Sequence, residues 1–174
     1  LSPSPARKQH LFGELRGLVD TFFAAIGQGL TLVTPLQLAQ MLSVVAENGV
    51  LHQPYLVEKV LNEDGTVLAV PQRAEAKNVG ISPETLALIR KGLLGVTQAG
   101  GTAAYFSNLG VPIAGKTGTA ENPHGQDHGL FIAYAPADNP KLVVAAVVEQ
   151  GSYGATAAGP IVYKVLEYML QEKD

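Results

Sequence analysis

The chain lacks residues and runs on which several classes of protein depend. It has no cysteine, which excludes disulfide bonds, thiol catalysis and cysteine-ligated metal. Its longest uninterrupted apolar run covers residues 142–148 and is too short to cross a bilayer. Charged residues make up only 16%, and the 12 Lys and Arg are scattered at a net charge of −3, so we expect no nucleic acid as a partner.

Hydrophobic residues are plentiful, at 47% of 174, which is enough for one domain with a core. The chain begins Leu-Ser-Pro-Ser-Pro without an initiator methionine or a signal peptide, so we interpret it as a piece of a longer protein. We expect residues 1–25 to be a loop or linker, partly disordered, and residues 26–174 to be the folded part.

Three helices are predicted by start signals and apolar spacing. The Thr-Pro-Leu-Gln of residues 34–37 forms a capping box, and the helix that it begins ends at Gly49. A similar Ser-Pro-Glu at residues 82–84 begins a second helix, which glycines 100–101 end, and residues 155–172 form the third. The expected buried faces are Leu38, Met41, Leu42 and Val45; Leu86, Ile89, Leu93 and Val96; and Ile161, Val162, Val165, Leu166, Met169 and Leu170.

Five strands are predicted by alternation and by apolar runs. Residues 55–61 and 66–70 flank an Asn-Glu-Asp-Gly turn and form a hairpin. Residues 113–121, 130–135 and 141–149 are joined by short loops, so we expect antiparallel neighbours, with the last strand covered on both faces. The predicted elements therefore place the chain in the α+β class, with an antiparallel sheet.

Two glycine-containing segments are interpreted as irregular. Gly27-Gln28-Gly29 lacks the third glycine and the downstream Lys-Ser/Thr of a phosphate loop, so we interpret it as a turn. Residues 102–111 are expected to form a loop that leads into the third predicted strand.

The strand at residues 113–121 carries the chemistry. Successive side chains of a strand point to opposite faces, so Lys116 and Gly118 share one face while Thr117 and Thr119 share the other. The lysine and the two threonines can donate to a carboxylate or an oxyanion, and Gly118 lets another chain approach the backbone. Such a ledge suits a peptide that adds itself as a strand, although Lys-Thr-Gly alone also arises by chance.

The remaining candidates are weaker. His124 and His128 flank Asp127 in a glycine-containing loop without a third ligand in sight, so a metal site is a minor interpretation. We expect His128 to orient the loop beside the key strand. Glu121 lies next to the ledge as a possible base, but ordinary charge pairing is preferred.

Five ordered stretches resemble a known family. In chain order they are Gly27-Gln28-Gly29, Thr34-Pro35-Leu36-Gln37-Leu38-Ala39, Gly100-Gly101-Thr102-Ala103, Gly115-Lys116-Thr117-Gly118-Thr119-Ala120 and Phe131-Ile132-Ala133-Tyr134-Ala135-Pro136. Together they resemble the C-terminal half of the transpeptidase domain of class B penicillin-binding proteins, the elongation type (penicillin-binding protein 2-like) most of all.

The resemblance implies the penicillin-binding transpeptidase and serine β-lactamase-like fold, an antiparallel sheet packed by helices. It also implies D,D-transpeptidation of peptidoglycan stem peptides through an acyl-serine. It implies that Lys116 and Thr117 contact the substrate or help a proton relay, and that Gly118 leaves room for the peptide. Thr119 would bind the terminal carboxylate and supply an oxyanion-hole N–H. β-Lactams, a membrane-embedded glycan polymerase and an extracytoplasmic, membrane-anchored parent are also implied, and no cofactor is.

One departure from the family concerns the nucleophile. Neither Ser-x-x-Lys nor Ser-x-Asn occurs in the chain, and the family uses these motifs for the nucleophile, its base and the proton network. We therefore expect the chain alone to be inactive, and stable only with a missing N-terminal half or as an oligomer. Two alternatives stay open, a non-catalytic peptidoglycan-binding or scaffolding module and a fragment of a serine β-lactamase.

Overall fold

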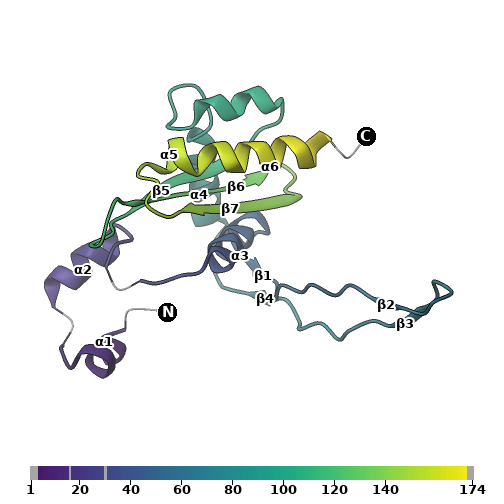
Figure 1. Cartoon of the computed structure of the whole chain (residues 1–174), viewed down its shortest axis with the longest axis horizontal. Helices are drawn as coiled ribbons and strands as arrows, with labels where there is room; N and C mark the ends of the chain where they lie inside the picture. Colours follow the sequence, from purple (N-terminus) through teal and green to yellow (C-terminus); the bar gives the residue numbers. More distant parts are fainter. Residues whose placement is uncertain (1–3, 16, 30, 172–174) are drawn as a thin grey trace. The chain divides into compact units, whose positions relative to one another are not determined.

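The computed structural model describes residues 4–15, 17–29 and 31–171 (Figure 1). They form two compact units. Unit 1 comprises Leu1–Leu38, Thr117–Ile132 and Ala145–Asp174, and unit 2 comprises Ala39–Lys116 and Ala133–Val144. Residues 1–3, where the expected linker begins, lie outside the described residues. No described helix is both long and apolar enough to span a membrane.

Unit 1 begins with two helices where a loop was expected. They are α1, Pro5–Phe12, and α2, Leu18–Ala25. The Gly17 N–H donates to the Asp20 carboxylate at 2.7 Å, and the Lys8 ammonium donates to the same oxygen at 2.8 Å. This hydrogen bond raises the pKa of Lys8. The loop prediction missed these contacts, because a cap and an ion pair stabilise short helices that propensity alone leaves marginal. The predicted boundary at residue 26 stays a prediction.

The predicted three-stranded sheet is confirmed. Its strands are β5, Ala114–Ala120, β6, His128–Ala135, and β7, Leu142–Val148, in the order β5-β6-β7. The short connections leave only antiparallel pairing, because a parallel crossover needs a dozen residues or more. The expected burial of both faces of β7 is wrong, since six of its seven residues are only half-buried and Val147 is 36% exposed.

The C-terminal helix is interrupted rather than continuous. It consists of α5, Gly154–Ala157, and α6, Gly159–Gln171, and Figure 1 shows α6 running over the strands. Val162 and Leu166 are fully buried as predicted, whereas Ile161 and Val165 are 49% and 40% exposed. The buried face of α6 is therefore narrower than the apolar face that the sequence predicts. Glu172, the predicted last helical residue, lies outside the described residues.

The capping box of α3, Pro35–Ala46, is confirmed. The Thr34 N–H donates to Gln37 Oε1 at 2.9 Å, and the Gln37 N–H donates to Thr34 Oγ1 at 3.2 Å. Leu42 is buried as predicted, but Met41 is 55% exposed. The helix is followed by Asn48 and Gly49, with φ +56° and +87°, and the Gly49 N–H donates to the Val44 carbonyl at 2.7 Å. The left-handed backbone at Asn48 therefore ends the helix, just before the predicted Gly49.

Helix α4, Pro83–Gly95, begins at Ser82, whose hydroxyl accepts from the Thr85 N–H at 3.2 Å. It ends before the predicted glycine pair. Its Arg90 guanidinium donates to the Val45 carbonyl at 2.6 and 2.9 Å and to the Ala46 carbonyl at 2.7 Å. These are the last carbonyls of α3, so a cation neutralises the negative end of that helix.

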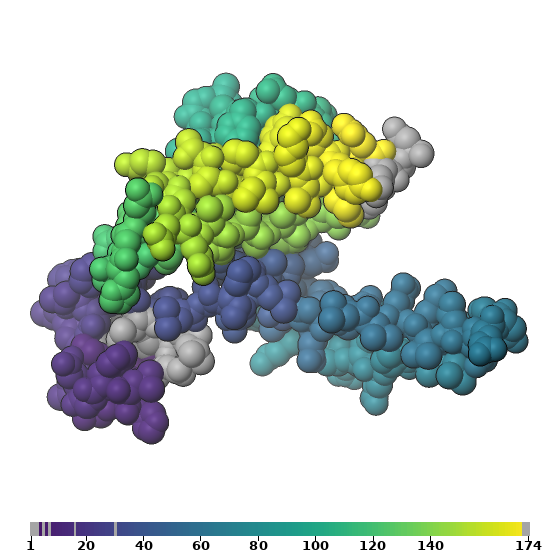
Figure 2. Space-filling view, in the orientation of Figure 1, coloured from purple at the N-terminus to yellow at the C-terminus, as the bar shows by residue number. Residues whose placement is uncertain are grey.

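An arm of unit 2 runs from β1, Val50–Leu51, to β4, Lys77–Asn78, which pair in antiparallel fashion at its base. At its tip, β2, Val60–Leu61, pairs with β3, Val67–Ala69, as the predicted hairpin with shorter strands. The Asn62 N–H closes the turn on the Thr66 carbonyl at 2.8 Å. The hairpin is exposed on both faces, and Figure 2 shows its two strands standing out in blue.

The expected loop at residues 102–111 contains a short 3-10 helix, η1, Ala104–Leu109. Phe106 on this helix is completely buried, so an apolar anchor orders a segment that its glycines indicated as irregular. Thr97, also buried, donates its hydroxyl to the Ile113 carbonyl at 2.5 Å. The end of α4 is thereby tied to the residue before β5. The remaining core side chains of unit 2 include Leu42, Val44, Leu86, Ile113 and Tyr134.

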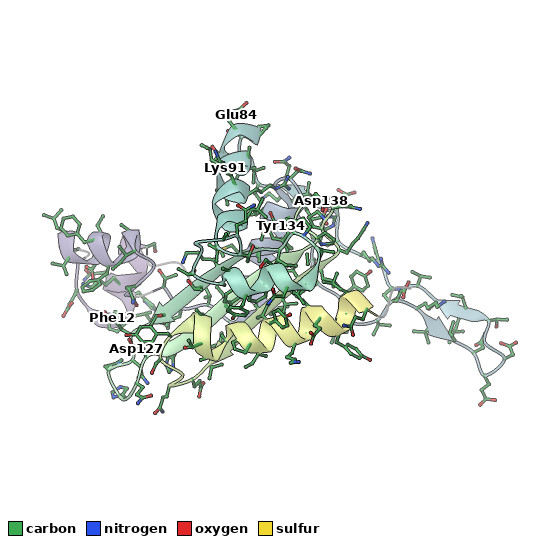
Figure 3. The ribbon with its side chains drawn as sticks, turned by 90° about the horizontal axis from the view of Figure 1, so that it is seen from above. Phe12, Glu84, Lys91, Asp127, Tyr134 and Asp138 are labelled. Atoms are coloured by element: carbon green, nitrogen blue, oxygen red, sulfur yellow. The ribbon has the colours of Figure 1, made fainter. Side chains whose placement is uncertain are left out.

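Replacing Arg90 tests the contact between α3 and α4. We expect Arg90→Met to lower the free energy of unfolding by about 2 kcal/mol, because it leaves partly buried carbonyls without their charged donor. Lys91→Met, at an exposed position of the same helix (Figure 3), should change it by no more than about 0.5 kcal/mol. Urea unfolding measures both, and equal losses would contradict the role given to Arg90.

Candidate active site

Strand β5 carries the four predicted site residues directly after two buried residues. Ala114 and Gly115 are buried, and the strand then comes to the surface. Lys116 and Thr119 are exposed, while Thr117 and Gly118 are partly exposed. The start of the strand is thus held by the core, and the part with chemical groups reaches the surface.

Close backbone approach at Gly118 is made by the chain itself. A Cβ on Gly154 of α5 would collide with the carbonyl oxygens of Gly118 and Leu130. The φ of Gly154 is not in the left-handed region, so only the lack of space requires glycine there. A Cβ on Gly118 would lie 3.3 Å from the Leu130 Cβ, so Leu130 leaves little space on that side of Gly118. Room for a substrate peptide beside Gly118 stays a prediction.

Gln28 approaches the same strand from the N-terminal part of unit 1. Its side-chain Nε2 donates to the Thr119 carbonyl at 3.4 Å. The predicted turn at residues 27–29 is confirmed, since Gly27 and Gly29 have φ +78° and +86°. Sequence reasoning did not assign Gln28 to the site. The available signal was the Gly-Gln-Gly stretch itself, one of the five that carry the family resemblance.

The loop between β5 and β6 is held by His128. Its Nδ1 accepts from the Gln150 N–H at 3.0 Å, and the Ser152 N–H donates to the Asp127 carbonyl at 2.8 Å. These two hydrogen bonds join the loop to the segment after β7, in line with the predicted orienting role of His128. Figure 3 labels Asp127 in this loop. Over residues 4–15, 17–29 and 31–171 no group of three or more His, Asp or Glu side chains could hold a metal ion. Among the same residues Glu121 forms no ion pair, so the predicted charge pairing of this side chain is wrong.

These groups define what the strand can bind. The Lys116 ammonium and the Thr119 hydroxyl are exposed donors, and the Thr117 hydroxyl is partly exposed. Donors held in advance on a rigid strand stabilise negative charge without reorganising. An anionic group, or an oxyanion that develops during acyl transfer, is therefore the species that β5 suits.

The family is established by comparison with known domains. Residues 6–167 match the family described as "Penicillin binding protein transpeptidase domain". The chain therefore belongs to the transpeptidase domain family of penicillin-binding proteins and covers part of that domain. The matched range begins within the segment that was expected to be a linker.

Individual relatives belong to class B of these proteins. The chain is 32% identical to "Peptidoglycan D,D-transpeptidase MrdA" of Haemophilus influenzae, over 88% of the chain and 26% of the relative. It matches the crystal structure of Pseudomonas aeruginosa PBP2 in complex with WCK 5153 with a TM-score of 0.81 at 32% identity, over 97% of the chain and 36% of that structure.

A third relative is a covalent complex. The imipenem acyl-enzyme complex of penicillin-binding protein A from M. tuberculosis matches with a TM-score of 0.76 at 31% identity, over 97% of the chain and 39% of that structure. The chain thus spans about a quarter of the length of the curated relative and little more than a third of the solved ones. The predicted fold class and family are confirmed by these matches.

Replacing Gly154 tests the packing behind β5. We expect Gly154→Ala to lower the free energy of unfolding by about 1–3 kcal/mol, because the new methyl group must push backbone aside. Gly92→Ala is the matched control, since nothing lies within 4 Å of its Cβ position in α4. That control should raise stability by up to about 1 kcal/mol. Two variants with equal unfolding midpoints would disprove the contact.

Proposed function

We propose that the chain is part of a serine D,D-transpeptidase that crosslinks peptidoglycan stem peptides and is acylated by β-lactams. The observation that carries the proposal is the Lys116-Thr117-Gly118-Thr119 strand, exposed directly after two buried residues in a chain of this family. We assign to Lys116 and Thr117 contact with the substrate or its proton relay. To Thr119 we assign the terminal carboxylate, through its hydroxyl, and one oxyanion-hole N–H.

The reaction requires a nucleophile that the chain does not supply. In acyl transfer of this kind a serine oxygen forms a bond to the peptide carbonyl, the C–N bond breaks, and the terminal residue leaves with a proton. An amine of a second stem peptide then takes the acyl group and frees the serine. Because Ser-x-x-Lys and Ser-x-Asn are absent, we place both motifs on a segment outside this chain and propose that the chain alone is inactive.

The first partner that we propose is that serine-bearing N-terminal half. Residues 26–174 would then be the C-terminal portion of a transpeptidase domain. Exposed apolar side chains on and beside α2 support the proposal, because surface of this kind in a stable protein is usually covered. Leu15 is 80% exposed, Leu18 78%, Phe22 69% and Ile26 75%. We therefore propose that the chain is stable only with this half or as an oligomer.

Further partners and the location follow from the family. The homologous structures with β-lactams support these drugs as ligands, and the activity named for the relatives supports stem peptides as the substrate. We further propose a membrane-embedded glycan polymerase as partner. The site would lie at the extracytoplasmic face of the inner membrane, with an anchor elsewhere in the protein.

A non-catalytic peptidoglycan-binding module is the second candidate, and the absence of both serine motifs favours it. Mass spectrometry of the purified protein before and after penicillin G decides between the two. We expect a second polypeptide to co-purify and to gain one penicillin mass while this chain gains none. If the chain travels alone and nothing is acylated, the enzyme proposal fails. Acylation of this chain would disprove the missing nucleophile, and rapid hydrolysis of penicillin would indicate a β-lactamase.

Removing the Thr119 hydroxyl tests the assigned site. In the assembly with the serine-bearing half, we expect Thr119→Val to slow acylation by penicillin G by about 10- to 100-fold, because the carboxylate of the drug loses a donor. Thr31→Val, at an exposed position outside the strand, should react at the wild-type rate. Unfolding midpoints of both variants show whether the fold is intact. Unchanged acylation in a folded Thr119→Val protein would remove Thr119 from the site.

A further inference from the structure

The Gly-Gln-Gly turn ends helix α2 in a defined way. The Gly27 N–H donates to the Ala24 carbonyl at 3.1 Å, and the Gln28 N–H donates to the Phe23 carbonyl at 2.9 Å. With Gly27 at φ +78°, these two bonds form a Schellman motif, in which the residue after the left-handed glycine closes on the helix. The backbone of Gln28 is thereby held relative to α2.

The second glycine restricts the turn further. Gly29 has φ +86°, and a Cβ there would lie 3.2 Å from the Phe23 Cβ. The chain therefore leaves Gln28 close to the end of α2, where a side chain on residue 29 would crowd Phe23. Both glycines serve the local turn, but neither explains the polar residue between them, because this position of a Schellman motif frequently carries a hydrophobic side chain that packs on the helix.

The side chain of Gln28 explains that choice. It spans 91 positions of sequence to donate from Nε2 to the Thr119 carbonyl at 3.4 Å. We propose that Gln28 is a positioning residue for strand β5. Its amide holds the peptide group that joins Thr119 to Ala120, and so orients the end of the strand that presents the Thr119 hydroxyl. The inference deepens the proposed function and rests on it for its catalytic consequence.

Whether residue 28 must donate a hydrogen bond can be tested with an introduced carboxyl group. Gln28→Glu keeps the size of the side chain, but an ionised carboxylate cannot donate to a carbonyl, whereas a protonated one can. A glutamate titrates near pH 4.3, so the contact should be absent at about pH 7 and return as the pH falls toward 4. Gln28→Met keeps the volume and has no donor at any pH. A role in packing alone would show no such pH dependence.

The first measurement uses this chain as it is purified, together with any second polypeptide that accompanies it. The carbonyl carbon shift of Thr119 and the amide shift of Ala120, recorded by NMR, report the hydrogen bond. We expect both to move in Gln28→Met and in Gln28→Glu at pH 7, and to return at low pH only in Gln28→Glu. Gln40→Glu is the matched control, because the Gln40 amide donates to another backbone carbonyl, that of His52, at 3.1 Å. Shifts of Thr119 that stay at wild-type values in every variant would overturn the proposal.

The second measurement uses the assembly with the serine-bearing half. The rate of acylation by penicillin G, taken relative to wild type at each pH, should fall by about 2- to 10-fold at pH 7 in Gln28→Glu and recover at low pH. A variant with the wild-type rate and altered Thr119 shifts would show that Gln28 does not act on the reaction. If the wild-type assembly is not acylated at all, the proposed function fails, and the NMR shifts alone decide whether Gln28 positions β5.

Discussion

The contact of α5 with the backbone of β5 is the constraint on which unit 1 depends. Gly154 lies so close to the carbonyls of Gly118 and Leu130 that no larger residue fits. Gly129 and Gly151 also face Ala157 of α5, because a Cβ on Gly129 would lie 3.2 Å and one on Gly151 2.9 Å from the Ala157 Cβ. Close packing at glycine fixes the distance between the backbones of α5 and β5, because no flexible side chain lies between them.

Three side chains donate hydrogen bonds to backbone carbonyls at or near the ends of helices and strands. Arg90 binds the last carbonyls of α3, Thr97 binds the Ile113 carbonyl before β5, and Gln28 binds the Thr119 carbonyl near its end. For α3 the acceptors are the last carbonyls of a helix, which the helix itself cannot pair. These bonds join α4 to α3, the end of α4 to the residue before β5, and the turn at residues 27–29 to the end of β5.

Local signals in the sequence were reliable where the cause is local. The capping box at Thr34 and Gln37 and the Ser82 cap need only residues within one turn, and they appear as expected. Burial was less predictable, because it depends on neighbours that periodicity does not name. Met41 carries the right spacing and is exposed, whereas Phe106 lies in a segment interpreted as loop and is completely buried.

The sequence by itself determined the family, the fold class and the three strands of the sheet, and it supplied the four residues of the candidate site as a prediction, since these follow from short-range patterns and from residue chemistry. Only the tertiary structure decided what lies against that site. Gly154 and Gln28 reach β5 from positions far away in the chain, and no local pattern reports such a distance. Contacts of this kind arise when the chain closes on itself, which is why they had to be seen in the fold.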